Sequence, residues 1–269
     1  MNYKLENKTV LVTGANGQLG LSLVDNLVKQ SAKVIATDIK SDNILRLIKK
    51  RNWNNKKILF LKCDLQEEKQ VKKLFKSLKS KVVSLDALVC NAGVAVFEHF
   101  LERKTSSFDK VVNVNIRGLF YFIREFIKYK KTSKKKSVIV NVASHYGLVA
   151  PDLSIYTDTR RMSSEVYGAS KAAIIQMTRY FAVNAVKYGV RTNSISPGGI
   201  KDDENPLGNK ATQKVKQGLN FRKRYNDRCP MRRLANVQEV VDPILFLLSP
   251  AASYINGHNI VVDGGYTAW

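Results

Sequence analysis

A tyrosine and a lysine four residues apart, Tyr167 and Lys171 in "YGASK", have the chemistry for proton transfer. At this spacing the two side chains share one face of a helix. A neighbouring ammonium favours the phenolate, so we expect Lys171 to lower the pKa of Tyr167 and make it usable as a general acid or base near neutral pH. Tyr-x-x-x-Lys is also common on helix surfaces, so the pair needs partners elsewhere in the chain.

Seven short apolar runs alternate with amphipathic segments and must position this pair. The runs cover 9–14, 33–38, 57–64, 86–93, 137–144, 190–199 and 258–265, and the amphipathic segments cover 18–30, 41–51, 66–80, 108–130, 166–187 and 237–248. Most runs are continuous and rich in Val and Ile, as in strands buried on both faces of a parallel sheet. The sequence therefore predicts one α/β domain over 1–269, a Rossmann-type doubly wound parallel sheet of about seven strands with helices on both faces. Ligands of such a sheet bind at the carboxyl ends of its strands.

A glycine-rich turn, "TGANGQLG" (13–20), joins the first run to the first amphipathic segment. Gly14 can make the tight turn, Gly17 lets the backbone approach a pyrophosphate, and Gly20 allows close packing of helix and sheet. The helix N-terminus then faces the anion. The strand–turn–helix context predicts a dinucleotide site. The same turn contributes the cofactor-binding candidates Asn16, Gln18 and Leu19.

Asp38 ends the second run, eighteen residues after Gly20. A carboxylate at this place can accept both ribose hydroxyls and repels a 2′-phosphate, so the sequence favours NAD, with NADP less favoured. Its alternative role is a cap for the helix over 41–51, but Ser41 and Asp42 fit that role better.

Two further strand ends are candidates for cofactor contacts. Asp64, followed by Leu65, suits an adenine amino group or, alternatively, caps the segment 66–80. Asn91, Ala92 and Gly93 end the fourth run, where small residues leave room for a cofactor or simply make a turn.

The chain is strongly basic, with 45 Lys and Arg against 22 Asp and Glu and a formal net charge of +23. The excess lies on helix faces of the kind that solvent covers, as in 67–81, and lacks interleaved aromatics or a nucleic-acid-binding motif, so no nucleic-acid partner is expected. No apolar run is long enough to span a membrane, and no signal peptide is expected. Three scattered cysteines without a C-x-x-C pattern argue against a metal site and fit a reducing cytoplasm.

Together these motifs resemble the short-chain dehydrogenase/reductase family in its compact single-domain form. The resemblance covers nearly the whole chain and rests on the glycine turn, Asp64, "NAG" (91–93), "VNVNIRG" (112–118), "IVNVAS" (139–144), "YGASK" (167–171), "RTNSISPGG" (191–199) and "GHNIVVDGG" (257–265). It implies reversible hydride transfer between a nicotinamide cofactor and a secondary alcohol or ketone.

The resemblance also implies a role for each catalytic candidate. Tyr167 would exchange the proton with the substrate oxygen, and Ser144 would hydrogen bond that oxygen. Lys171 would lower the pKa of Tyr167 and hold the nicotinamide ribose, and Asn115 would hold the water that links Lys171 to solvent, or pin a neighbouring strand.

Residues after the sixth run complete the implied cofactor site. Pro197 and Gly198 would lie along the nicotinamide, with Ile200 behind the carboxamide. Two departures from the family pattern stand out: position 18 is Gln where the compact form has its second glycine, and "PGGIKDDENP" lacks the threonine that often contacts the carboxamide. The spacing with Gly17 is more typical of the family's longer, sugar-nucleotide-modifying branch.

Two serines compete as the partner of Tyr167. Ser154 lies thirteen residues before Tyr167, close to the separation usual in the family, but it follows Pro151 in an irregular stretch. We favour Ser144, because it ends a buried strand and a catalytic group needs rigid support. Residues 145–165 then contain an insertion of about ten residues beside the catalytic pair and form a candidate wall of the substrate pocket.

A narrower resemblance concerns the substrate. The stretch 144–171 and its continuation look like the dehydrogenases of flagellin-modification and nonulosonic-acid sugar pathways, which implies a sugar, sugar phosphate or sugar nucleotide. The segment 201–230 lies where the family has its substrate lid, and an anionic substrate would find cations there. The lid and the insertion carry Lys210, Lys214, Lys216, Arg222, Lys223, Arg224, Arg228, Arg160 and Arg161, against the acidic Asp202, Asp203 and Glu204.

Other functions stay open. A 3-oxoacyl-thioester reductase also fits, although Asp38 disfavours the NADPH that such enzymes commonly use. A non-catalytic dinucleotide-binding regulator would have lost Tyr167 or Lys171, and both are present. By the resemblance we expect a homotetramer or homodimer, with the C-terminal tail and the helices 108–130 and 166–187 as contact faces.

Overall fold

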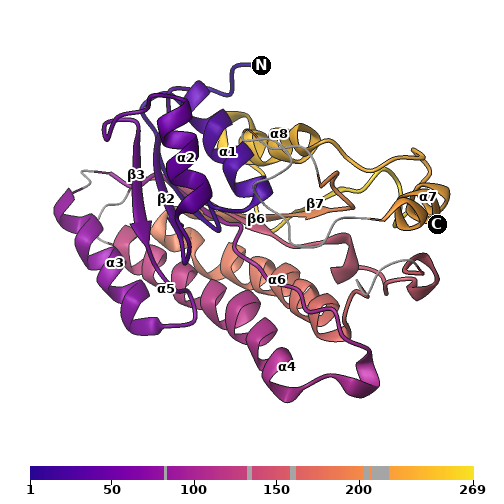
Figure 1. The fold of residues 1–269 in the computed structure, drawn as a ribbon. Helices are drawn as coiled ribbons and strands as arrows, with labels where there is room; N and C mark the ends of the chain where they lie inside the picture. Colours follow the sequence, from indigo (N-terminus) through magenta and orange to yellow (C-terminus); the bar gives the residue numbers. More distant parts are fainter. Residues whose placement is uncertain (82–83, 132–134, 158–161, 203–205, 207–217) are drawn as a thin grey trace.

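A single sheet of seven parallel strands forms the centre of the computed structural model, in the order β3-β2-β1-β4-β5-β6-β7 (Figure 1). The structure describes residues 1–81, 84–131, 135–157, 162–202, 206 and 218–269. The strands are β1 (Thr9–Thr13), β2 (Lys33–Asp38), β3 (Ile58–Lys62), β4 (Ala87–Cys90), β5 (Ser137–Val142), β6 (Val190–Pro197) and β7 (Asn259–Val262). The predicted Rossmann-type doubly wound sheet is confirmed.

Helices cover both faces of the sheet. In Figure 1, α1, α2 and α8 lie on one side and α3, α4, α5 and α6 on the other. The helices are α1 (Gln18–Lys29), α2 (Asp42–Lys50), α3 (Glu68–Lys81), α4 (Thr105–Val112), α5 (Leu119–Lys130), α6 (Glu165–Asn184), α7 (Leu219–Arg228) and α8 (Val237–Leu248).

The alternation of side chains along β1 divides the core into two layers. Val10 and Val12 pack into the cluster shared with α1, α2 and α8, whereas Leu11 between them packs into the cluster shared with α3, α5 and α6. All three are fully buried. A strand buried on both faces favours apolar residues at consecutive positions, which is why the centre of β1 reads as a continuous apolar run.

The predicted helix over 108–130 is interrupted. It begins earlier, as α4, and passes through the π-helix Asn113–Gly118 before it continues as α5. An apolar repeat does not distinguish an α-turn from a π-turn, so the π-helix could not be predicted from the pattern. Such π-turns are frequent at functional sites.

Ser41 takes the predicted N-cap position of α2 without the capping bond expected of its side chain. Asn16, from the glycine turn, makes such bonds instead: its Oδ1 accepts from the backbone N–H groups of Asn43 and Ile44 at 2.8 and 2.9 Å. This contact ties α2 to the turn after β1.

The C-terminal part of the lid contains a helix that the sequence pattern did not indicate. Helix α7 packs against the short 3-10 turn Leu153–Ile155 of the insertion and forms a third apolar cluster. Ile155, Phe221 and Tyr225 belong to this cluster. Lid and insertion therefore meet beside the carboxyl ends of β5 and β6, where Ser144 and Gly198 follow the strands.

Candidate active site

The turn between β1 and α1 needs glycine at two of its three glycine positions. Gly14 has a φ of +65°, and a Cβ there would lie 2.7 Å from the Cα of Ala92. A Cβ on Gly20 would collide with the Gly14 carbonyl oxygen and the Cα of Ala15. At Gly17 the nearest atom to such a Cβ would be 3.6 Å away. The protein's own packing thus does not require glycine at position 17, and a contact of Gly17 with the cofactor stays a prediction.

Asn91 joins the glycine turn to the end of β4. Its Nδ2 donates to the carbonyl oxygens of Thr13 and Gly14 at 3.1 and 2.9 Å. The Thr13 hydroxyl in turn accepts from the backbone N–H groups of Asn91 and Ala92, both at 3.1 Å. These bonds hold the turn between β1 and β4, where the order of the strands along the sheet reverses. Open α/β sheets bind ligands at such a point.

Asp38 lies beside this turn at the carboxyl end of β2. Its carboxylate accepts from the backbone N–H groups of Asn16 and Lys40, each at 3.0 Å. Partial burial raises the pKa of Asp38, and these backbone hydrogen bonds oppose the rise. The carboxylate is thus fixed at the strand end where a ribose is expected.

The side chains of the other candidates in the turn have different surroundings. The side chain of Asn16 is occupied by α2, where its Nδ2 also donates to Asp42 at 3.0 Å. The Gln18 amide donates to the carbonyl oxygen of Lys201, the first residue of the lid. Leu19 lines the cavity described below.

The candidates after β3 are placed in a turn. Asp64 accepts from the backbone N–H of Gln66 at 3.0 Å, and Leu65 is buried. The carboxylate of Asp64 is therefore used in the turn that leads into α3, and a contact with adenine stays a prediction.

Tyr167 and Lys171 lie one turn apart near the start of α6. The Nζ of Lys171 lies 5.5 Å from the centre of the Tyr167 ring and donates to the carbonyl oxygen of Val142, at the end of β5, at 2.9 Å. Lys171 is 4% exposed, and burial lowers its pKa to about 8. The lysine is thus anchored to the strand end that precedes Ser144.

The pKa of Tyr167 is raised, not lowered as the spacing suggested. Burial raises it, and a hydrogen bond with the Ser144 side chain opposes the rise. The spacing correctly puts Lys171 on the same helix face, but its ammonium lies near the ring and is bonded to a backbone oxygen. At neutral pH the Tyr167 side chain is therefore a protonated phenol.

Of the two competing serines, Ser144 is the one beside Tyr167. Ser144 is buried, and its Oγ also accepts from the backbone N–H of Tyr146 at 3.2 Å. Ser154 is exposed in the 3-10 turn Leu153–Ile155, where its carbonyl oxygen accepts from Arg224.

Asn115, in the π-helix, is fully buried and connects three parts of the site. Its amide exchanges two hydrogen bonds with the backbone of Val94, at 2.8 and 3.0 Å, and donates to the Ser170 hydroxyl at 2.9 Å. A Cβ on Gly93 would lie 3.3 Å from Lys171 Nζ and 3.5 Å from Asn115 Oδ1. The pinning role is therefore present, and the missing side chain of Gly93 leaves a gap that both Lys171 Nζ and Asn115 Oδ1 border.

Two adjoining cavities open at this sheet edge. The first, of about 280 Å³, is lined by Leu19, Asn91, Gly93, Val94, Ala95, Val142, Ala143, Ser144, Tyr167, Lys171, Pro197, Gly198 and Ile200. The second, of about 250 Å³, is lined by Ala95, Phe97, Ser144, His145, Tyr146, Tyr156, Ser163, Tyr167, Gly198, Gly199, Ile200, Phe221 and Tyr225. Ser144 and Tyr167 line both cavities, so a group bound in one cavity would lie beside a group bound in the other.

Residues of the predicted insertion and lid line the second cavity, but sequence reasoning did not point to Phe97 and did not single out Tyr225. Phe97 follows "NAG" without a motif, and Tyr225 lies within the basic run "RKRYNDR". The Tyr225 hydroxyl accepts from the backbone N–H of Gly199 at 2.6 Å, which holds α7 against the end of β6. No pattern in the sequence marks such a long-range contact.

The described arginines of the lid have partners within the protein. Arg222 pairs with Asp202, and Arg228 lies 3.6 Å from the carboxylate of Asp152. Neither these two nor Arg224 lines the second cavity. Lys210, Lys214, Lys216, Arg160, Arg161, Asp203 and Glu204 lie outside the described residues.

Within the described residues, no group of three His, Cys, Asp or Glu side chains is arranged to hold a metal ion. No helix among them is long and apolar enough to cross a membrane. The three cysteines are buried and unbridged.

Comparison with known proteins agrees with this fold and site. A family model described as enoyl-(acyl carrier protein) reductase matches residues 14–267. A 3-oxoacyl-(acyl-carrier-protein) reductase of Thermotoga maritima is 31% identical over 97% of this chain and 98% of its own length. An NAD-dependent glycerol dehydrogenase of Listeria innocua is 30% identical over 99% and 96%, respectively.

A solved structure is equally similar. A short chain dehydrogenase from Leptospira borgpetersenii, crystallised with bound NAD+, superposes with a TM-score of 0.86 and 33% identity, over 98% of this chain and 94% of that one. The chain belongs to the short-chain dehydrogenase/reductase family and is an NAD(P)-dependent oxidoreductase.

Proposed function

We propose that this enzyme transfers a hydride between NAD and a secondary alcohol or ketone, with Tyr167 as the proton donor and acceptor. The observation that carries the proposal is the grouping of Ser144, Tyr167 and Lys171 at the border of two adjoining cavities. A bound nicotinamide supplies or accepts the hydride. Its site fits the residues present, because the glycine turn, the gap at Gly93 and the fixed Asp38 carboxylate line up along one sheet edge.

Each protein group has a defined task in this proposal. In reduction, the protonated phenol of Tyr167 gives its proton to the carbonyl oxygen, and the Ser144 hydroxyl donates a hydrogen bond to the same oxygen. Lys171 stabilises the phenolate that forms, since its pKa of about 8 keeps it mostly protonated at neutral pH. Asn115 holds the Val94 backbone in place and, through water near Lys171, would pass the proton onward from solvent.

NAD rather than NADP is the proposed cofactor. The Asp38 carboxylate is held by two backbone hydrogen bonds, so it cannot easily turn away from a 2′-phosphate placed at the strand end. The like charges would then repel one another. Pro197, Gly198 and Ile200 line the first cavity and would hold the nicotinamide end.

The proposed substrate is carbohydrate-like, with the reacting hydroxyl or carbonyl beside Ser144. The second cavity has aromatic faces and hydroxyl groups, from Tyr146, Tyr156 and Ser163 of the insertion and from Tyr225 of the lid. These groups suit a ligand with apolar faces and several hydroxyls. The pairing of the described lid arginines favours a neutral ligand over the anionic one expected from the charge count.

A second candidate is a 3-oxoacyl thioester. It is supported by the similarity to the Thermotoga maritima reductase and by the apolar part of the cavity wall, which includes Phe97 and Phe221. The fixed Asp38 carboxylate disfavours a thioester reductase that uses NADPH, because it would repel the 2′-phosphate.

A cofactor and substrate matrix separates these candidates. NADH and NADPH affinities would be measured by fluorescence titration, and reduction of fructose, fructose 6-phosphate and acetoacetyl-CoA would be followed at the nicotinamide absorbance. We expect tighter binding of NADH and preference for fructose over its phosphate. Preference for acetoacetyl-CoA would select the second candidate, and absence of binding of either cofactor would refute the enzymatic proposal.

We also propose a homo-oligomer. The helices expected at the interface carry exposed apolar side chains, with Phe120 37% exposed on α5 and Tyr180 and Val183 61% and 73% exposed on α6. Solution mass by light scattering would test this, and a monomer at micromolar concentration would contradict it. The proposed location is the cytoplasm.

A further inference from the structure

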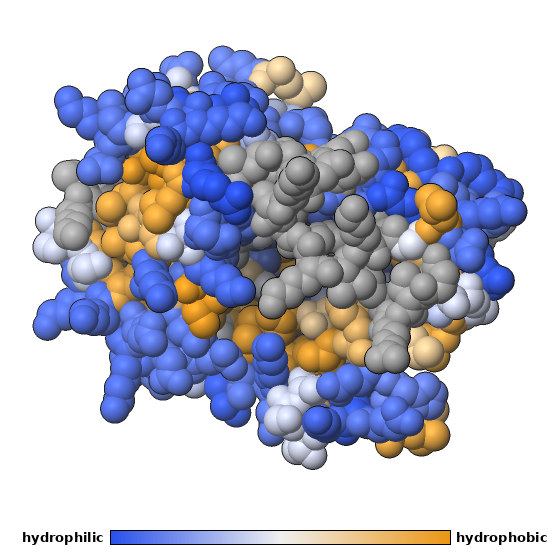
Figure 2. Space-filling model, in the orientation of Figure 1, coloured by the Kyte–Doolittle hydropathy of each residue, from blue (hydrophilic) through white to orange (hydrophobic). Residues whose placement is uncertain are grey.

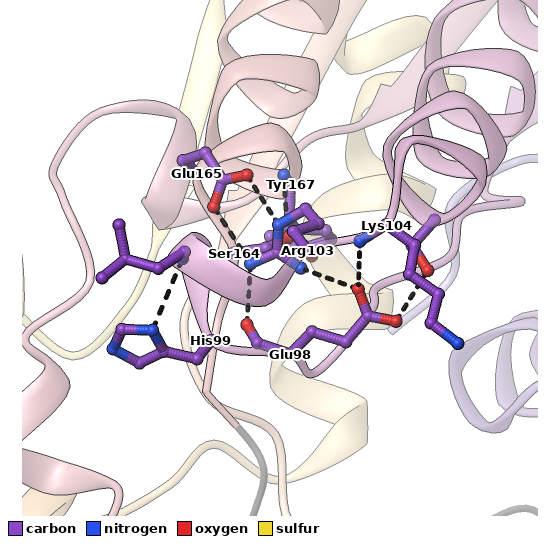
Figure 3. Close-up of polar contacts among 9 residues, drawn as sticks. Glu98, His99, Arg103, Lys104, Ser164, Glu165 and Tyr167 are labelled. Atoms are coloured by element: carbon purple, nitrogen blue, oxygen red, sulfur yellow. Dashed lines mark hydrogen bonds and ion pairs between the residues drawn. The ribbon is translucent and has the colours of Figure 1, made fainter.

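Arg103 is a nearly buried cation outside the two cavities described above, and with Glu98 and Glu165 it lines a third cavity of about 430 Å³. Its side chain is only 5% exposed. Its guanidinium donates to both carboxylate oxygens of Glu165, at 2.6 and 3.0 Å, and to the carbonyl oxygen of Glu98 at 2.8 Å (Figure 3). The carboxylate of Glu98 lies 3.8 Å from the guanidinium as well. Such two-point bonds fix orientation as well as distance.

The Glu165 side of this network is the start of the catalytic helix. Glu165 is the first residue of α6, and Ser164 before it caps the helix by accepting from the backbone N–H of Tyr167 at 3.2 Å. A carboxylate in the first turn is favoured by the helix dipole, and the hydrogen bond to Arg103 lowers the pKa of Glu165. Arg103 is thus bonded to the helix two residues before Tyr167.

On its other side Arg103 bonds the end of a segment, 94–98, that supplies part of the wall of the second cavity. Residues 94–98 are held at one end by Asn115, which exchanges two hydrogen bonds with the Val94 backbone, and at the other end by Arg103. Ala95 and Phe97, between these two anchors, line the second cavity. In the lower part of the face shown in Figure 2, apolar side chains in orange are bordered by polar ones in blue.

We propose that Arg103 is a positioning residue that fixes the Phe97 wall of the substrate cavity relative to Tyr167. This inference rests on the proposed function, because it assigns the second cavity to the substrate. Release of Arg103 lets the wall and the start of α6 move independently. A displacement of about 1 Å at such a place can reduce the reaction rate by up to about a hundredfold.

The network around Arg103 allows this role to be separated from general stability. Glu98 keeps two other bonds without Arg103, from the Ser107 hydroxyl at 2.7 Å and the Lys104 backbone N–H at 3.3 Å. Glu165 is half-exposed and can be solvated by water. Removal of the guanidinium therefore should loosen a connection without unfolding either segment. Lysine keeps the charge but cannot bond two oxygens in the same plane.

The test compares Arg103→Lys, Arg103→Gln and Glu165→Gln with a matched control, Arg124→Gln. Arg124 also bonds two carboxylates, those of Glu68 and Glu125, but it joins α5 to α3. Reduction of fructose and of acetoacetyl-CoA by NADH gives KM and kcat, fluorescence titration gives the NADH affinity, and hydrogen exchange is followed in the peptides covering 94–104 and 162–170.

For the three test variants we expect KM for the reduced probe to rise about tenfold, with NADH affinity within about twofold of the parent. Hydrogen exchange should become faster in both peptides. The control variant should keep the parental KM and the parental exchange rates. Restoration of KM by lysine, an equal loss of NADH affinity, or unchanged exchange would each overturn the proposal. If the parent reduces neither probe, the proposed substrate assignment fails, and the exchange measurement still decides whether Arg103 holds the two segments together.

Discussion

The buried Lys171 should make the stability of the enzyme depend on pH in a calculable way. Burial lowers its pKa from 10.5 to about 8. Because each pKa unit corresponds to about 1.4 kcal/mol, the folded protein holds the charged lysine at a cost of about 3 kcal/mol below pH 8. The unfolded chain binds this proton more tightly, so the free energy of unfolding rises as the pH goes from about 8 to about 10.5.

The variant Lys171→Met isolates this effect, because methionine keeps a similar volume without a charge. Urea unfolding of both proteins would be measured from about pH 7 to about pH 10. All other titrations cancel in the difference, while the loss of the bond to the Val142 carbonyl adds a term that does not depend on pH. The difference between the unfolding free energies, parent minus variant, should increase by about 2.5 kcal/mol over this range. A difference that stays constant with pH would refute the reasoning.

Three further predictions concern the cofactor and the serine. Gly20→Ala should lower the free energy of unfolding, measured by urea unfolding, by about 1–3 kcal/mol, because the new methyl group collides with Gly14 and Ala15. Gly17→Ala should leave this free energy unchanged but weaken NADH binding, measured by fluorescence titration. Asp38→Ala should shift the ratio of NADH to NADPH affinity toward NADPH by about tenfold, and an unchanged ratio would contradict the ribose role. Ser144→Ala should reduce kcat about a hundredfold while Ser154→Ala does not, and equal losses would mean that the serine is wrongly assigned.

The strands and most helices could be predicted because their signal is local. In β1 and β5 every residue is buried, and each strand has at least three consecutive apolar residues, which marks it as a strand covered on both faces. The ends of these runs carry the glycine turn, Asn91 and Ser144, so the edge that holds the site was also visible in the sequence.

The contacts that complete the site are long-range and leave no periodic trace. Asn16 caps α2 across 27 residues, and Arg103 reaches Glu165 across 62. Arg103, in "LERKT", looks from the sequence like one of the many exposed cations of a basic chain, but its side chain is nearly buried. The spacing correctly predicted that Lys171 lies on the same helix face as Tyr167, but it could not show how deeply the two residues are buried. Burial raises the pKa of Tyr167, which is the opposite of the predicted shift.

Turnover of the Tyr167→Phe variant tests the central claim most directly. Phenylalanine keeps the ring and removes only the hydroxyl that would exchange the proton, so the NADH affinity should stay within about twofold of the parent while kcat for the reduced probe falls by about 10²–10⁴. A variant that binds NADH and reduces the same probe at the parental rate would contradict the assignment of Tyr167 as the proton donor.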